Sequence, residues 1–168
     1  MRGWTVVCED ESIFIHDSVS RYVWAKEGSE PIVLTTGSHR RTCAFGALSL
    51  GGRQLFRRYA NVDGENFLAY LQELERKFAP MLLFLDRSSP HHTDQKVRYY
   101  LWANRDRIEA MWFPTARPEL NPIEECWRQC KDIVQANRIY PTFEDMRAEI
   151  SRVLRTRRFG LDIAEYLC

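Results

Sequence analysis

The chain has 168 residues, of which 45% are hydrophobic and 28% charged, and its formal net charge is +1. This size and composition are typical of one globular domain and exclude disordered chains, while a charge so close to zero argues against binding nucleic acid by charge alone, although a cluster of acids can mask a local basic surface. No apolar run is long enough for a membrane helix and no signal peptide is recognisable, so we expect a cytoplasmic protein that does not contact membranes.

The amino-terminal part of the sequence predicts antiparallel strands. Short β-type runs, broken by Gly, Ser and Asp, cover Trp4–Cys8, Ile13–His16, Tyr22–Ala25 and Thr42–Leu50. The pair Gly51-Gly52 is expected to turn the chain into another strand around Gln54–Tyr59.

From Gly64 the hydrophobic period changes from that of strands to that of helices. Apolar residues at helical spacing predict a helix that ends before Pro80, namely Phe67, Leu68, Leu71, Leu74 and Phe78. The unbroken apolar run Met81–Leu85 predicts a strand in the middle of a sheet, buried on both faces. Next we expect a helix capped by Thr93, with Val97, Tyr100 and Leu101 on its apolar side, and then a buried strand at Ile108–Phe113.

Two further helices complete the predicted order. The first opens at Asn121-Pro122-Ile123-Glu124 and turns Ile123, Trp127, Cys130 and Val134 inward. The second opens at Thr142 and turns Phe143, Met146, Ile150, Val153 and Leu154 inward. Antiparallel strands followed by βαβ-like units predict an α/β fold, with one mixed sheet flanked by helices in a single domain over residues 1–168.

Cysteine and tryptophan positions add two expectations. The five cysteines are an odd number without a C-x-x-C pair, so we expect reduced, packed thiols rather than disulfides or a zinc ribbon: Cys8, Cys43, Cys126, Cys130 and Cys168. Four tryptophans are expected in the core, and the first of them could instead reach DNA from a hairpin: Trp24, Trp102, Trp112 and Trp127.

Three acids are the candidate chemical centre. Asp10 follows the first predicted strand and Asp86 ends the buried strand, where open α/β sheets place reacting groups. Glu124, in the first turn of a helix, could reach the same point and complete an all-oxygen site for Mg²⁺ or Mn²⁺, of the kind that serves phosphoryl transfer. Each acid also has a structural interpretation, because Asp10 suits a solvated turn, Asp86 a loop cap, and Glu124 a capping box with Asn121.

The sequence segments around these acids resemble the motifs of a known family. The segment Pro-Glu-Leu-Asn-Pro-Ile-Glu-Glu-Cys-Trp at 118–127 resembles the P-[DE]-L-N-P-I-E-x-x-W motif of DDE transposases, in the mariner-like group with many bacterial insertion-sequence enzymes. Val7–Ser12 resembles the strand-D-E-S segment of that family, and Trp24–Gly28 resembles its W-x-x-x-G hairpin. Leu83–Asp86, followed by His91, resembles its second acidic motif, and 37 residues lie between Asp86 and Glu124.

This resemblance implies an RNase H-like fold with a five-stranded sheet, and Asp10, Asp86 and Glu124 as the metal-binding triad, with two Mg²⁺ or Mn²⁺ ions as cofactors. It implies cleavage of transposon ends and strand transfer into target DNA, at a TA dinucleotide. Glu125 is the rival third acid, about 100° away around the helix. Two alternatives stay open: an RNase H-like nuclease that hydrolyses DNA or an RNA–DNA hybrid without joining strands, and an inactive DNA-binding remnant.

The resemblance also bears on partners. The amino-terminal helix-turn-helix region of the family is absent from this chain, so we expect end recognition to need a separate helix-turn-helix chain or a missing segment. Synaptic assemblies of relatives suggest a homodimer, acting on DNA of the nucleoid.

Several residues are expected to contact DNA. Arg87 stands where the family usually has Asn, and could pair with a DNA phosphate or with Asp86 itself. The stretch Phe113–Pro118 also differs from the family's P-P-Y-S-P. His91 matches the family's His, and the basic flank of the last helix suits phosphates through Arg147, Arg155 and Arg158. Exposed loop histidines and a solvated helix face are the structural alternatives for these residues.

Overall fold

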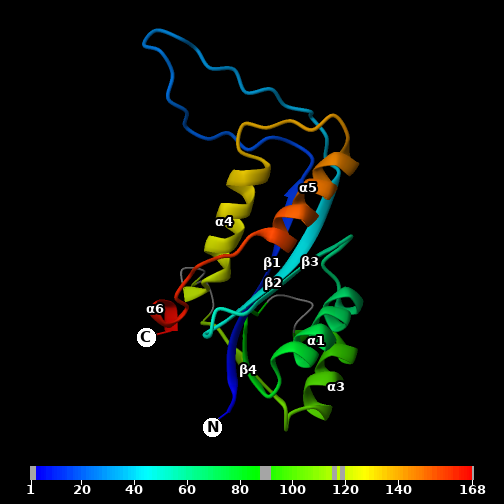
Figure 1. Cartoon of the computed structure of the whole chain (residues 1–168). Helices are drawn as coiled ribbons and strands as arrows, with labels where there is room; N and C mark the ends of the chain where they lie inside the picture. The colour runs from blue at the N-terminus through cyan, green and yellow to red at the C-terminus, as the bar shows by residue number, and fades with distance from the viewer. Residues whose placement is uncertain (1–2, 88–91, 115–116, 118–119, 168) are drawn as a thin grey trace.

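The computed structural model describes residues 3–87, 92–114, 117 and 120–167. Within these residues, five strands form one mixed sheet in the spatial order β3-β2-β1-β4-β5 (Figure 1). The strands are β1 (Thr5–Ile15), β2 (Arg41–Ser49), β3 (Gln54–Tyr59), β4 (Met81–Leu85) and β5 (Ile108–Trp112). The strands β1, β2 and β3 pair antiparallel, whereas β4 and β5 run parallel to β1. The predicted antiparallel meander followed by parallel strands is therefore confirmed.

The central strand β1 is longer than predicted. It runs without a break for 11 residues, so the two short strands expected at Trp4–Cys8 and Ile13–His16 are one. The polar stretch between them suggested a turn, but its backbone pairs with β2, and Asp10 lies opposite Gly46. Asp10 is therefore inside the strand rather than just past it. Because β4 pairs only with Thr5–Cys8, the rest of β1 has, among the described strands, a neighbour on one side alone.

Two pairs of helices cover the two faces of the sheet (Figure 1). One face carries α1 (Gly64–Phe78) and α3 (Gln95–Ala103), and the other carries α4 (Ile123–Val134) and α5 (Phe143–Thr156), followed by the short α6 (Ala164–Leu167). The helix α3 begins after Asp94, not Thr93. The Asp94 carboxylate accepts from the backbone N–H groups of Lys96 and Val97 at 2.8 and 3.1 Å, and a carboxylate satisfies these donors well.

The hydrophobic core has one half on each side of the sheet. All the apolar residues that were predicted to face inward on α4 and α5 are buried. β5 departs from its prediction, because Glu109 and Met111 on one of its faces are exposed. β5 is the last strand of the sheet, and the helices α4 and α5 make their contacts with β1, β2 and β3 instead.

The segment between β1 and β2 projects from the body (Figure 1). The strand predicted at Tyr22–Ala25 does not form, although a turn links Lys26 and Ser29 through a backbone hydrogen bond of 3.0 Å. The indole of Trp24 is fully exposed, so its predicted place in the core is wrong. No partner strand lies against this part of the segment within the described chain. Its base is tied to α4 by an ion pair of 2.9 Å between Arg21 and Asp132.

Three further tryptophans differ in burial, whereas the described cysteines are alike. Trp127 lies in the core as predicted, whereas Trp102 is exposed and Trp112 half-buried. The cysteines in the described part of the chain are buried free thiols, as expected, at Cys8, Cys43, Cys126 and Cys130. Cys168 lies outside the described residues. Among the described helices, none has the length and apolar character needed to cross a membrane.

Candidate active site

Two neighbouring parallel strands bring Asp10 and Asp86 side by side. In the register of β1 and β4, Val7 lies opposite Leu83 and Cys8 lies opposite Phe84. Asp10 comes two residues after Cys8, and Asp86 comes two residues after Phe84. Because side chains alternate with a period of two along a strand, Asp10 lies on the same face as Cys8, on the side of α4. The two acids that the sequence pattern singled out, Asp10 and Asp86, are therefore neighbours in the structure.

The cluster of acids has a member that was not singled out from the sequence. Asp10, Glu11 and Asp86 offer carboxylate oxygens that all lie within 4.8 Å of one another. Glu11 belongs to the opposite face of a regular strand, yet β4 has ended at this point. Side chains from both faces of β1 can therefore reach Asp86 around the open edge. The Asp-Glu-Ser segment contained this residue, but nothing in the spacing indicated its contribution.

Glu124 stands near this cluster on α4. Its side chain is exposed in the first turn of the helix, and its charge is the largest carboxylate influence on Asp10. It is not one of the three acids whose oxygens lie within 4.8 Å of one another.

The capping-box explanation for Glu124 is wrong. The helix begins at Ile123 after Pro122, and Asn121 has another role. The side-chain oxygen Oδ1 of Asn121 accepts from the Ile123 N–H at 3.2 Å, and its side-chain amide Nδ2 donates to the backbone carbonyl of Glu9 at 3.1 Å. Asn121 is thus a buried link between the start of α4 and the strand that carries Asp10.

Glu125, the rival acid, is engaged on the helix surface. It forms an ion pair of 2.6 Å with Arg128, one turn along α4. The hydrogen bonds from Arg128 lower the pKa of Glu125, and Gln129 adds a further donor. Glu125 is therefore held in a surface network beside the cluster rather than in it.

A hydrogen bond from Trp127 fixes the Asp10 carboxylate on the interior side. Its indole N–H donates to Oδ2 of Asp10 at 3.0 Å, and both side chains are buried. The ring stands edge-on to Phe56 with centroids 5.4 Å apart. Gly46, the register partner of Asp10, makes room for both rings, because a Cβ there would lie 2.4 Å from Phe56 and 2.7 Å from Trp127. One turn of α4 thus presents Glu124 at the surface and Trp127 in the interior.

The cluster concentrates negative charge in a poorly solvated place. Burial raises the pKa of Asp10 to about 8, with further contributions from Glu124, Glu11 and Asp86, while the hydrogen bond from Trp127 lowers it. Burial also raises the pKa of the fully buried Glu9 well above its usual range, and the charges of Glu11, Asp10 and Asp86 add to the effect. A hard divalent cation would relieve this repulsion, and the donor set consists of the carboxylate oxygens that Mg²⁺ and Mn²⁺ prefer.

The predicted DNA-contacting residues are distributed unequally. Arg87 is exposed directly after Asp86, whereas His91 lies outside the described residues. Arg147, Arg155 and Arg158 lie on or just after α5, which packs against β3 at the other edge of the sheet. The structure therefore does not bring these three arginines to the acids. Arg147 also faces Glu144, with 3.9 Å between the charged groups.

Comparison with known proteins identifies the family and the fold. The family model described as DDE superfamily endonuclease matches residues 5–147. A Sinorhizobium fredii (strain NBRC 101917 / NGR234) protein, "Uncharacterized protein y4pE/y4sA", is 33% identical over 88 residues, which cover 50% of this chain and 60% of the relative.

Solved structures of the Mos1 transposase share the fold. The mariner Mos1 paired end complex with Mg matches with a TM-score of 0.69 and 15% identity, covering 96% of this chain and 52% of that one. The Mos1 transposase paired-end complex with left transposon end matches with a TM-score of 0.65 and 14% identity, covering 90% and 48%. This chain thus spans about half the length of those proteins, and the predicted RNase H-like fold is confirmed. Since the family match extends over most of its residues, the chain belongs to the DDE superfamily endonucleases.

Proposed function

We propose that this chain is the catalytic domain of a transposase, which cuts DNA strands and joins them to a target by phosphoryl transfer with divalent metal ions. The observation that carries the proposal is the convergence of Asp10 and Asp86 at the end of β4, with Glu124 close by on α4. Membership of the DDE superfamily endonucleases supports it. The fold shared with Mos1 complexes that contain a transposon end, or Mg, is in keeping with DNA as the partner.

The carboxylates of Asp10, Asp86 and Glu124 would hold the metal, with Glu11 as an additional oxygen donor. Bound divalent ions would supply activation of the attacking oxygen and neutralisation of charge on the leaving oxygen. Trp127 fixes Oδ2 of Asp10, so that Oδ1 is left for the cluster. Asn121 ties the start of α4 to the backbone of β1, and thereby sets the position of Glu124 relative to Asp10.

The substrate is proposed from the same arrangement and from the family resemblance. Within the described residues, β1 has no neighbouring strand beyond Cys8 on the side of β4, and a DNA strand could approach this edge. Arg87 presents an exposed cation next to Asp86, suited to a backbone phosphate. Water would attack at a transposon end, and a DNA 3′-hydroxyl would then attack target DNA at a TA site. Recognition of the ends is assigned to a helix-turn-helix region outside this chain, and a homodimer would hold two ends together.

The test is a cleavage and joining assay with Mn²⁺. Labelled duplexes carry the DNA sequences from either side of the gene, and a scrambled duplex serves as the substrate control. Asp86→Asn removes a proposed ligand with little change of shape, whereas Glu125→Gln removes a nearby acid that is already paired with Arg128. We expect wild type and Glu125→Gln to nick and join the ends, and Asp86→Asn to do neither.

Other outcomes separate the alternatives. Metal-dependent nicking without joined products would replace the transposase proposal with that of a nuclease. Equal behaviour of wild type and Asp86→Asn would overturn both catalytic proposals and favour an inactive DNA-binding remnant.

A further inference from the structure

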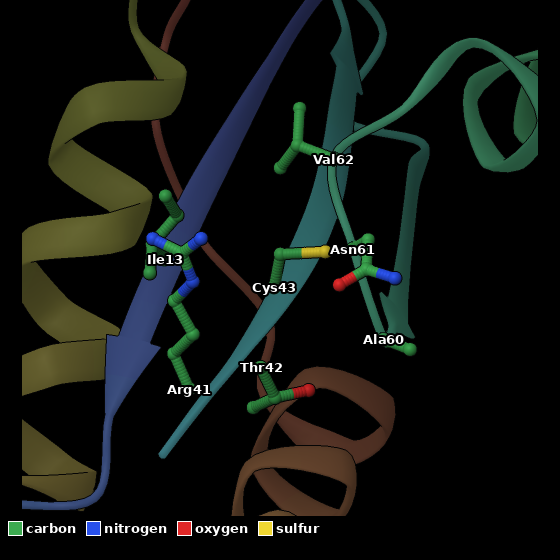
Figure 2. Close-up of a pocket in the computed structure, with 7 residues that line it drawn as sticks. All are labelled: Ile13, Arg41, Thr42, Cys43, Ala60, Asn61 and Val62. Atoms are coloured by element: carbon green, nitrogen blue, oxygen red, sulfur yellow. The ribbon is translucent and has the colours of Figure 1, made fainter. Parts of the chain in front are cut away.

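An open pocket lies on the same sheet as the acids, toward the far end of β1 and β2. Its volume is about 150 Å³, and Figure 2 shows its walls. Cys43 lies in the middle, with Arg41 on one side and Asn61 on the other. The remaining lining comes from Ile13, Thr42, Ala60 and Val62. The pocket stays open because α1 begins only at Gly64, so the link from β3 to α1 forms one wall.

The register of β1 and β2 places this pocket next to Glu11, on the face of the sheet opposite to Asp10 and α4. Ile13 lies opposite Cys43, and Glu11 lies opposite Phe45 in the neighbouring pair on the same face. One step of two residues along β1, roughly 7 Å, therefore separates the pocket from Glu11. A DNA strand whose scissile phosphate lay at the acids would therefore reach the pocket by passing around the edge of β1 beside Glu11.

The polar groups of the pocket suit an anion. Arg41 is exposed, and its guanidinium makes no ion pair within the described part of the chain. The side-chain amide of Asn61 is likewise exposed, without a hydrogen bond to any described residue. The neighbouring Arg40 differs, because it pairs with Glu144 at 3.1 Å and covers the ring of Phe143.

The acid nearest to Asn61 along the chain has donors of its own, while its charge and that of Glu11 act on Cys43 in the pocket. Asp63 accepts from the Asn66 N–H at 2.8 Å and from the Asn66 amide at 3.0 Å at the start of α1. The Arg41 guanidinium and the Asn61 amide line the pocket on opposite sides of Cys43, and each can donate hydrogen bonds to phosphate oxygens.

We propose that the pocket between Arg41 and Asn61 binds a backbone phosphate of the DNA strand, one or two nucleotides from the phosphate that is cut. The proposal rests on the proposed function, because it takes the acids as the place of cleavage. Arg41 supplies the charge, Asn61 supplies an amide N–H, and the exposed edge of Ile13 contacts the adjoining sugar. The pocket would set the path of the strand without reading its sequence.

The test measures DNA binding in the absence of divalent metal, so that no cleavage occurs. Fluorescence anisotropy with a labelled mixed-sequence duplex and the matching single strand gives the affinity of the whole chain over a range of salt concentrations. The variants are Arg41→Gln and Asn61→Ala. The matched control is Arg105→Gln, which removes the same charge at the end of the sheet farthest from the acids, where Arg105 contacts Trp102.

We expect Arg41→Gln to weaken binding about tenfold at low salt, and to reduce the slope of log K against log[salt] by about one. Asn61→Ala should weaken binding by a smaller factor without changing the slope, because it removes no charge. Arg105→Gln should change neither quantity. If Arg41→Gln behaves like Arg105→Gln, or if wild type binds neither DNA, the pocket proposal is overturned.

The proposed function fails separately. If Arg41→Gln leaves DNA binding unchanged while the chain still nicks DNA in an Asp86-dependent manner, only the pocket proposal is overturned. Arg41-dependent binding in a chain that never cuts DNA would keep the pocket as a phosphate site and remove the catalytic role.

Discussion

The hydrogen bond from Trp127 to Asp10 leads to the sharpest prediction. Trp127→Phe keeps an aromatic ring beside Phe56 but removes the N–H that donates to Oδ2 at 3.0 Å. A buried hydrogen bond to a charged group contributes about 1.5–3 kcal/mol. We therefore expect unfolding in urea, at a pH above the Asp10 pKa of about 8 so that the carboxylate is charged, to show a loss of at least this size, since the smaller ring also leaves unfilled space.

The same change should weaken metal binding in a pH-dependent way. The hydrogen bond holds down a pKa that burial has raised to about 8, and its loss should raise that pKa by about one unit or more. At neutral pH a proton then competes about tenfold better with Mn²⁺ for Asp10. Titration of the metal-free chain with Mn²⁺, followed by electron paramagnetic resonance, should show about tenfold weaker binding at pH 7. The deficit should shrink as the pH rises above both pKa values.

Trp112→Phe is the control, because Trp112 is half-buried on β5 and belongs to the other half of the core. It should leave Mn²⁺ affinity unchanged at every pH. If Trp127→Phe lowers stability but keeps the affinity of wild type for Mn²⁺, then Trp127 is a core residue alone and the positioning argument fails.

Three further predictions concern the acids and their support. Glu124→Gln should abolish Mn²⁺-dependent nicking, whereas Glu125→Gln should keep it and lose at most about 1 kcal/mol of stability with its surface ion pair; equal loss of nicking would contradict the assignment. The pKa of Asp10 is about 8 in the folded chain against a reference value of 3.8, so the unfolded state binds fewer protons between these values. Metal-free stability should therefore fall as pH rises from about 4 to 8, by at most about 1.4 kcal/mol per pH unit, and urea melts of Asp10→Asn should show a flatter profile. Gly46→Ala should cost about 1–3 kcal/mol of stability in urea melts and weaken Mn²⁺ binding, because its Cβ would push the ring that bonds to Asp10. Gly51→Ala, which meets no atom within 4 Å, should melt like wild type.

Much of the fold follows from local patterns. The apolar run before Asp86 predicts β4, and the inward residues of α4 and α5 are those with helical spacing, because burial on one face imposes that period on the sequence. The same patterns are poor at strand length. Polar residues in the middle of β1 suggested a turn, since nothing local shows that β2 pairs with their backbone.

The β-type sequence pattern around Trp24 likewise led to a wrong prediction. An aromatic residue in a β-type run favours the core, but burial needs a neighbouring surface, and the segment after β1 projects away from the sheet (Figure 1). Sequence periodicity describes one element at a time, and it contains no information on what packs against that element.

The three acids show which features of the candidate site sequence patterns can and cannot predict. The sequence by itself determined their residue types and the motif that carries Glu124, and through that motif the family. Only the tertiary structure decided that Asp10 lies within a strand, that Glu11 joins it beside Asp86, and that Trp127 holds its carboxylate. These contacts arise because β1 continues past the end of β4 while α4 crosses beside Gly46, and both facts depend on pairing between segments that are distant in the chain.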